Sequence, residues 1–210
     1  MTRRRRNRNF RRKQGTSPEL DVIWVYAEGE KTEPLYVNGL KRDLGLGNIS
    51  VRKVGSRTAP SSLLEKAKRE ISRAGQNGPD KVYLLFDRDQ FDCFQPAIEE
   101  CRTDRIITAI PSDPCFEYWL LLHVTRTTRA FENANQVITE LKRYPPFTGY
   151  FKAKDGVYDE IKHLTDVAME NAAACRLQIQ AADASRPHTK VDKLITSLIE
   201  QRNRIQSARK

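Results

Sequence analysis

The sequence has few of the residues that bind zinc or form disulfides. It contains three histidines and four cysteines among 210 residues. The cysteines, Cys93, Cys101, Cys115 and Cys175, show none of the CxxC spacing that is found in zinc sites and redox pairs. We therefore expect packing thiols in a reducing cytosol, with neither disulfides nor a structural zinc site.

Long apolar runs are also missing from the chain. No stretch approaches the roughly 20 apolar residues that a membrane-spanning helix needs. The N-terminus is charged where a secretory signal would be apolar. With 39% hydrophobic and 30% charged residues, the composition is typical of a soluble protein. We expect a cytoplasmic protein without membrane contact, built as one domain or as one domain with a modest extension.

The net charge of +10 is concentrated at the N-terminus. Subtracting the eight basic residues of positions 1–18 from the total of 37 leaves 29 basic and 27 acidic residues in positions 19–210. Residues 1–18 have almost nothing apolar to bury, so we expect a disordered arm. The arm either binds nucleic-acid phosphates without sequence preference or is a solvated leader. Its basic residues are Arg3, Arg4, Arg5, Arg6, Arg8, Arg11, Arg12 and Lys13.

Strands and helices alternate along the first half of the remaining chain. Apolar, β-branched and aromatic runs predict strands at residues 21–27, 49–54, 81–86 and 105–110. Helical patterns occur at about 32–45, 61–74, 96–101, 115–123, 130–143, 167–184 and 191–205. This order predicts an α/β fold, with a mainly parallel sheet flanked by helices. We expect a core over residues 19–125 and a helical extension over residues 126–210 that packs on it.

Acidic side chains follow two of the predicted strands. Glu28 comes after the strand at 21–27, and Asp87 and Asp89 come after the strand at 81–86. The carboxyl ends of parallel strands form the ligand site of such sheets, and Mg²⁺ prefers oxygen ligands. Acidic residues are also common in turns and helix caps, so either strand end alone is weak evidence. Together the two ends predict an Mg²⁺ or Mn²⁺ site and phosphodiester chemistry.

The loop after the first strand contributes further candidates. Gly29 permits a tight exit from the strand and leaves room for a phosphate. Lys31 either neutralises a phosphoryl oxygen or is a solvent-exposed loop lysine. Glu30 and Glu33 are assigned to the loop and to the first turn of the helix. Thr32 is expected to cap that helix.

Four sequence blocks give the chain a resemblance to known proteins. The glutamate after one strand and the Asp-x-Asp after another resemble the Toprim fold of topoisomerases, bacterial-type primases and related nucleases. More closely, the chain is similar to the RloB and AbiLii-like group of small Toprim proteins. The resemblance identifies residues 19–125 as a Toprim core. The four blocks are YAEGEKTEPLY at 26–36, LLFDRDQF at 84–91, PCFEYWLLLH at 114–123 and RPHTKVDKLI at 186–195.

The resemblance implies metal-dependent cleavage of nucleic acid in bacterial phage defence, beside a partner ATPase. It adds Glu117 to the site as a ligand or base, and a buried carboxylate there needs a metal, an arginine or backbone donors nearby. His123 lies about 240° around the helix from Glu117, so we expect a structural histidine. His188, which replaces the group's usual serine, and Lys190 are candidate substrate contacts, although helix capping also explains His188.

Several alternatives remain open at this level. The chain is too short for the gate domains of a topoisomerase or the accessory modules of a primase. It is either a nuclease, with Glu28, Asp87, Asp89, Glu117 and Lys31 at its catalytic site, or a non-cleaving nucleic-acid-binding or regulatory subunit that works with the ATPase. The sequence does not decide between DNA and RNA, between a monomer and a homo-oligomer, or what triggers activity.

Overall fold

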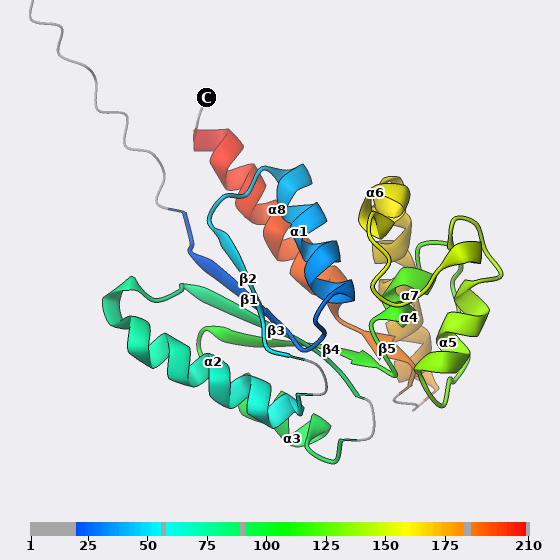
Figure 1. The fold of residues 1–210 in the computed structure, drawn as a ribbon, viewed down its shortest axis with the longest axis horizontal. Coiled ribbons are helices and arrows are strands. Elements are labelled where there is room, and N and C mark those ends of the chain that lie inside the picture. The colour runs from blue at the N-terminus through cyan, green and yellow to red at the C-terminus, as the bar shows by residue number, and fades with distance from the viewer. Residues whose placement is uncertain (1–19, 56–57, 89–90, 183–185, 209–210) are drawn as a thin grey trace, which may run out of the picture.

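The chain forms a five-stranded sheet with helices on both of its faces (Figure 1). The computed structural model describes residues 20–55, 58–88, 91–182 and 186–208. The α/β class and the mainly parallel, helix-flanked sheet are as the sequence predicts. In chain order the elements are β1 (Ile23–Ala27), α1 (Thr32–Leu44), β2 (Ile49–Lys53), α2 (Pro60–Ala74), η1 (Gly75–Asn77), β3 (Lys81–Asp87), α3 (Phe94–Arg102), β4 (Ile107–Asp113), α4 (Glu117–Leu121), α5 (Ala134–Leu141), η2 (Phe147–Gly149), α6 (Val157–Ile161), η3 (Lys162–Leu164), α7 (Thr165–Ala181), β5 (His188–Thr189) and α8 (Val191–Ala208).

The strand order β2-β1-β3-β4-β5 places β1 and β3 side by side in the sheet. The first four strands are parallel, with Ala27 opposite Leu85. β5 runs antiparallel to β4, with His188 opposite Asp113. β5 was not predicted, because two residues carry no readable alternation. The parallel arrangement brings the carboxyl ends of β1, β3 and β4 to one edge of the sheet.

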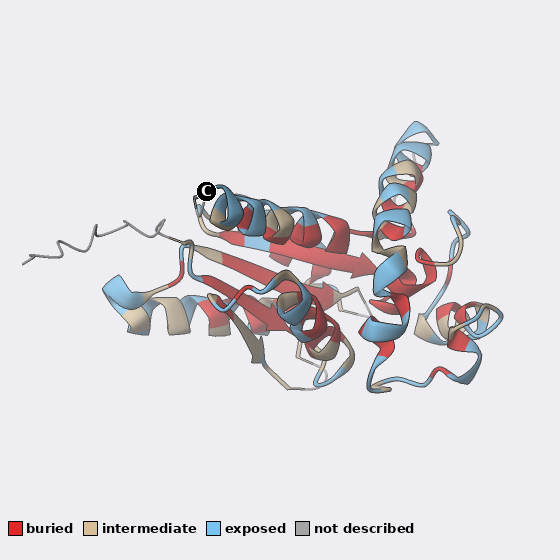
Figure 2. Ribbon diagram, turned by 90° about the horizontal axis from the view of Figure 1, so that it is seen from above, coloured by how far each residue is buried: buried red, intermediate tan, exposed pale blue. Residues whose placement is uncertain are grey.

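The central strands are buried along most of their length (Figure 2). In β1, Ile23 and Val25 pack on the face that α1 and α8 cover, whereas Trp24 and Tyr26 pack on the face of α2 and α3. No residue of β1 is more than 7% exposed. A strand covered on both faces reads as a continuous apolar run, which is why the sequence identified it correctly.

The N-terminus of α1 differs from the prediction in one respect. The helix begins at Thr32, but Lys31 occupies the N-cap position and no side chain caps the helix. The Thr32 hydroxyl instead accepts a hydrogen bond from the Ala153 backbone N–H at 3.2 Å. The Thr32 oxygen that was expected to cap α1 therefore binds the loop at Ala153 instead.

α4 and α5 are shorter than the helices that the sequence predicts at about 115–123 and 130–143. α4 ends at Leu121, after which the chain continues in tight turns to Thr125. α5 begins at Ala134, because the side chain of Asn133 caps it by accepting from the Gln136 N–H. In the described part of the chain, no helix combines the length and the apolar character needed to cross a membrane. The four cysteines are free, and Cys101, Cys115 and Cys175 are buried as packing thiols.

His123 is a buried, hydrogen-bonded residue of the core, as the sequence predicts. It is 1% exposed, and its Nδ1 donates to the Trp119 carbonyl at 3.0 Å. Its Nε2 is then left to accept from the Tyr36 hydroxyl at 3.4 Å, which requires a neutral ring. Burial lowers the pKa of His123 from 6.5 to about 4.

This depressed pKa predicts a loss of stability in weak acid. The unfolded chain binds a proton at His123 near pH 6.5, whereas the folded chain binds it only near pH 4. The contribution of the neutral His123 to the stability of the fold is therefore complete above pH 6.5 and is lost as the pH falls towards 4. We expect the free energy of unfolding to fall by about 3 kcal/mol across this window through His123. Urea denaturation at a series of pH values measures it. A His123→Gln variant should show a flatter profile, and parallel profiles for the two proteins would contradict the prediction.

Candidate functional site

The ends of β1 and β3 place two of the predicted carboxylates next to each other. The backbone N–H of Glu28 donates to the Leu85 carbonyl at 3.0 Å, which continues the pairing of the strands. The Glu28 Oε2 atom accepts from the Asp87 backbone N–H at 3.1 Å. Glu28 is 5% exposed, and Asp87 is half-buried. The glutamate that leaves one strand is therefore fixed directly on the end of the other.

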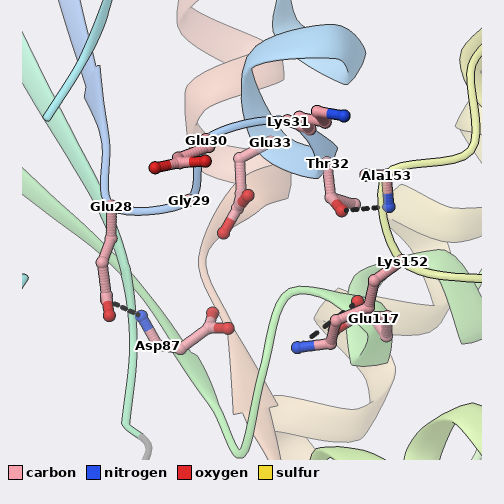
Figure 3. A pocket seen from close by; sticks show the side chains of 10 residues that line it. All are labelled: Glu28, Gly29, Glu30, Lys31, Thr32, Glu33, Asp87, Glu117, Lys152 and Ala153. Carbon is pink, nitrogen blue, oxygen red and sulfur yellow. Dashed lines mark hydrogen bonds and ion pairs between the residues drawn. The ribbon is translucent and has the colours of Figure 1, made fainter. Parts of the chain in front are cut away.

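A cavity of about 560 Å³ opens at this edge of the sheet (Figure 3). Five of the described residues around it carry carboxylates, and two carry ammonium groups. Glu33 and Glu117 are 7% and 2% exposed, so much of this negative charge is buried. The lining residues are Glu28, Gly29, Glu30, Lys31, Thr32, Glu33, Asp87, Glu117, Lys152 and Ala153.

Glu33 was assigned from the sequence only to the first turn of α1, but it also lines the cavity. Its carboxylate lies so close to Gly29 that a Cβ atom on residue 29 would overlap it. A side chain at residue 29 would therefore displace the Glu33 carboxylate from this position. No local sequence signal distinguishes Glu33 from an ordinary acidic residue in the first turn of a helix, where negative charge is favourable anyway.

Glu117 reaches the same cavity from the start of α4. Its Oε1 atom accepts from the Tyr150 hydroxyl at 3.1 Å and lies 3.8 Å from the Lys152 ammonium. A metal, an arginine or backbone donors were expected beside it, and the structure supplies a tyrosine and a lysine instead. Burial, followed by the charge of Glu117, raises the pKa of Tyr150 far above its usual value, so its hydroxyl stays protonated.

The two lysines of the cavity differ in how they face it. Lys31 is exposed, and in Figure 3 its ammonium group points away from Glu28 and Asp87. The Lys152 side chain enters from the loop after η2 and pairs with Glu117. Lys31 is thus exposed and also lines the cavity, so both alternatives for it stay open. Lys152 could not be predicted from the sequence, because only tertiary packing brings its loop to the sheet.

A second charged cluster joins the DRD sequence to the end of β4. Asp113 is completely buried and holds two arginines, with Arg88 Nη1 and Arg186 Nε each 2.8 Å from its carboxylate oxygens. Arg186 also donates to the Phe131 carbonyl at 3.1 Å. Arg88 lies between Asp87 and Asp89 in the sequence, so Asp113 anchors the segment that carries them. No local pattern in the sequence indicates this role, because the two arginines lie 25 and 73 residues away.

His188 and Lys190 lie at the same edge of the sheet but outside the described lining of the cavity. His188 pairs with Asp113 through β5, and the Lys190 N–H donates to the Pro111 carbonyl at 3.1 Å. Burial lowers the pKa of Lys190, and the positive charges of Arg102 and Arg176 lower it further. That His188 and Lys190 contact the substrate stays a prediction. The hydroxyl of Thr189 accepts from the first N–H of α8, so capping accounts for Thr189.

Part of the predicted site lies outside the described residues. Asp89 is one such residue, and so are Arg3, Arg4, Arg5, Arg6, Arg8, Arg11, Arg12 and Lys13. In the part of the chain that is described, no three His, Cys, Asp or Glu side chains gather closely enough to hold a metal ion. The donor chemistry still suits Mg²⁺ or Mn²⁺, because every acidic group around the cavity offers carboxylate oxygens. Glu28 and Asp87 are the described members of the predicted ligand set, and they lie next to each other.

One comparison with known proteins confirms the RloB part of the resemblance. A family model described as RloB-like protein matches residues 23–198. The match runs from the start of β1 into α8 and includes Glu28, Asp87 and Glu117. No curated protein and no solved structure matches the chain.

Proposed function

The chain belongs to the RloB-like family, and we propose that it is an Mg²⁺-dependent nuclease of Toprim type that hydrolyses phosphodiester bonds of nucleic acid in bacterial phage defence. The observation that carries the proposal is the cavity at the ends of β1 and β3. Five carboxylates line it against two lysines. A phosphodiester anion would be repelled from such a cavity unless cations were bound there, and divalent metal ions supply that charge.

The described residues divide the work of such a site. Glu28 and Asp87, with Asp89, would hold the ion, and when bound the ion would activate water and stabilise charge on the phosphoryl oxygens. Lys152 supplies a positive charge for the substrate phosphate from the opposite wall of the cavity. Tyr150 holds the Glu117 carboxylate in place through its hydrogen bond. Glu117 would then act as a base or as an outer ligand.

The nuclease proposal is tested by removing the metal. Purified protein is incubated with single-stranded and double-stranded DNA and RNA in Mg²⁺, in Mn²⁺ and in EDTA. We expect cleavage of at least one substrate with either metal, loss of cleavage in EDTA, and recovery when Mg²⁺ is returned in excess. Cleavage that persists in EDTA would contradict the proposal.

One observation favours a second candidate function. Eight basic residues are concentrated in positions 1–18, which suits a non-cleaving nucleic-acid-binding or regulatory subunit that works with a partner ATPase. In that case the eight basic residues of the N-terminal arm would supply most of the affinity for nucleic acid. Binding that is lost on deletion of residues 1–18, without cleavage even when the ATPase is present, would support this function over the nuclease.

A further inference from the structure

A turn at residues 151–154 forms part of the cavity wall. The Lys154 N–H donates to the Phe151 carbonyl at 3.1 Å, which closes the turn. Ala153, inside it, has a φ of 69° and is the only non-glycine residue with positive φ in the described ranges. Such a backbone persists only where its surroundings enforce it, and strained positions of this kind cluster at functional sites.

Contacts on both sides hold this turn in its unfavourable conformation. Tyr150, just before it, donates to Glu117, and the N–H of Ala153 donates to Thr32 at 3.2 Å. Lys154 binds the Glu160 carboxylate at 2.8 Å. The backbone that carries Phe151 and Lys152 is therefore held in place between these anchors.

Phe151 is exposed in a loop whose other aromatic residues are buried. It is 62% exposed, whereas Phe147 and Tyr150 are each 1% exposed. Among the described residues, the other large apolar side chains that are exposed are aliphatic: Val22, Val167 and Leu177. Phe151 directly precedes Lys152, which lines the cavity, and its exposed ring is available to a ligand that would cover it.

We propose that this turn recognises single-stranded nucleic acid, with the Phe151 ring stacking on an unpaired base while Lys152 contacts the backbone phosphate in the cavity. In a duplex the faces of the bases are covered by their neighbours, so a protruding ring finds a partner only where a base is unstacked. Stacking on an aromatic ring is tolerant of sequence, because every base has such a face. The proposal rests on the proposed nuclease function and names the substrate class of that site.

The test measures binding in an Asp87→Asn background, so that cleavage does not consume the ligand. Fluorescence anisotropy with a short labelled strand, as DNA and as RNA, is compared with the blunt duplex of the same sequence. We expect Phe151→Ala to weaken single-strand binding by roughly tenfold and to leave duplex binding unchanged. Phe151→Trp should retain the affinity, and Leu177→Ala, which removes an exposed leucine of α7, should have no effect.

The outcomes separate this inference from the nuclease proposal. A loss confined to single strands supports the stacking role, and the DNA and RNA arms show which strand is the ligand. Equal affinity of the unmodified and Phe151→Ala proteins for every single strand would overturn it, as would an equal loss for the duplex. Either negative result leaves the nuclease proposal standing. Binding that depends on Phe151 in a protein that never cleaves would reject the nuclease and keep the stacking site.

Discussion

Asp87→Asn is expected to lower the rate of Mg²⁺-dependent cleavage by about a thousandfold, which corresponds to about 4 kcal/mol of lost transition-state stabilisation. Asparagine has nearly the volume of aspartate but no charge, so it binds a divalent ion much more weakly. The backbone N–H of residue 87, which donates to Glu28, is unchanged by the substitution. Initial rates of cleavage under saturating Mg²⁺ measure the effect. Asp155→Asn, an exposed residue near the turn at 151–154, is the matched control and should cleave normally.

The stability of this variant distinguishes a functional role from a structural one. Five carboxylates repel one another around the cavity in the absence of metal. Removing one of these charges should therefore leave the thermal midpoint unchanged or raise it slightly, as happens where a site sacrifices stability for function. Full cleavage by Asp87→Asn would exclude Asp87 from the mechanism. Lost cleavage together with a lower midpoint would instead show that Asp87 mainly supports the fold.

Asp113→Asn is expected to lower the free energy of unfolding by about 2 kcal/mol. Removing one partner of a fully buried ion pair costs about 3–5 kcal/mol. The cost here is smaller because the Arg88 and Arg186 side chains are 41% and 34% exposed and can be rehydrated. Urea denaturation at neutral pH measures the change. The control is Asp159→Asn, whose partner Arg42 and own side chain are both exposed and which should not shift the urea midpoint.

Asp113→Asn should also reduce cleavage, because Asp113 anchors Arg88 in the DRD sequence. Arg88→Gln tests this connection separately from the fold. It removes the anchor of the Asp87 and Asp89 segment while Arg186 continues to satisfy Asp113. We expect cleavage to fall more than stability in Arg88→Gln. An unchanged denaturation midpoint in Asp113→Asn would show that the buried carboxylate contributes nothing to the stability of this edge of the sheet.

The sequence predicted the central strands and most helices because their patterns are local. The run at β1 is apolar on both faces and indicates a buried parallel strand. The break at Gly45, which has a φ of 67°, ends α1 where the sequence suggested. The pattern was less informative where residues are buried on all sides. α4 is such a segment, and its five residues read as part of a longer helix.

The residues of the candidate site likewise fall into those that a local pattern predicts and those that it does not. Glu28 and Asp87 could be predicted because each follows a recognisable strand, and parallel strands end at a common edge. Tyr150, Lys152 and Asp113 could not. Tyr150 is 33 residues from the Glu117 carboxylate that it binds, and Asp113 is 73 residues from Arg186. Contacts between residues so far apart in the chain produce no periodic pattern in a single sequence.

The sequence by itself determined the α/β class, the two acidic strand ends and the concentration of positive charge in the first 18 residues. These features depend on side-chain periodicity and on composition, which act within one element. Only the tertiary structure decided that Lys152 joins Lys31 around the cavity and pairs with Glu117, that Glu33 joins the carboxylates, and that Phe151 stays exposed. The physical reason is that these contacts join segments distant in the chain, and packing and hydrogen bonding choose among such partners only once the sheet and its helices have formed.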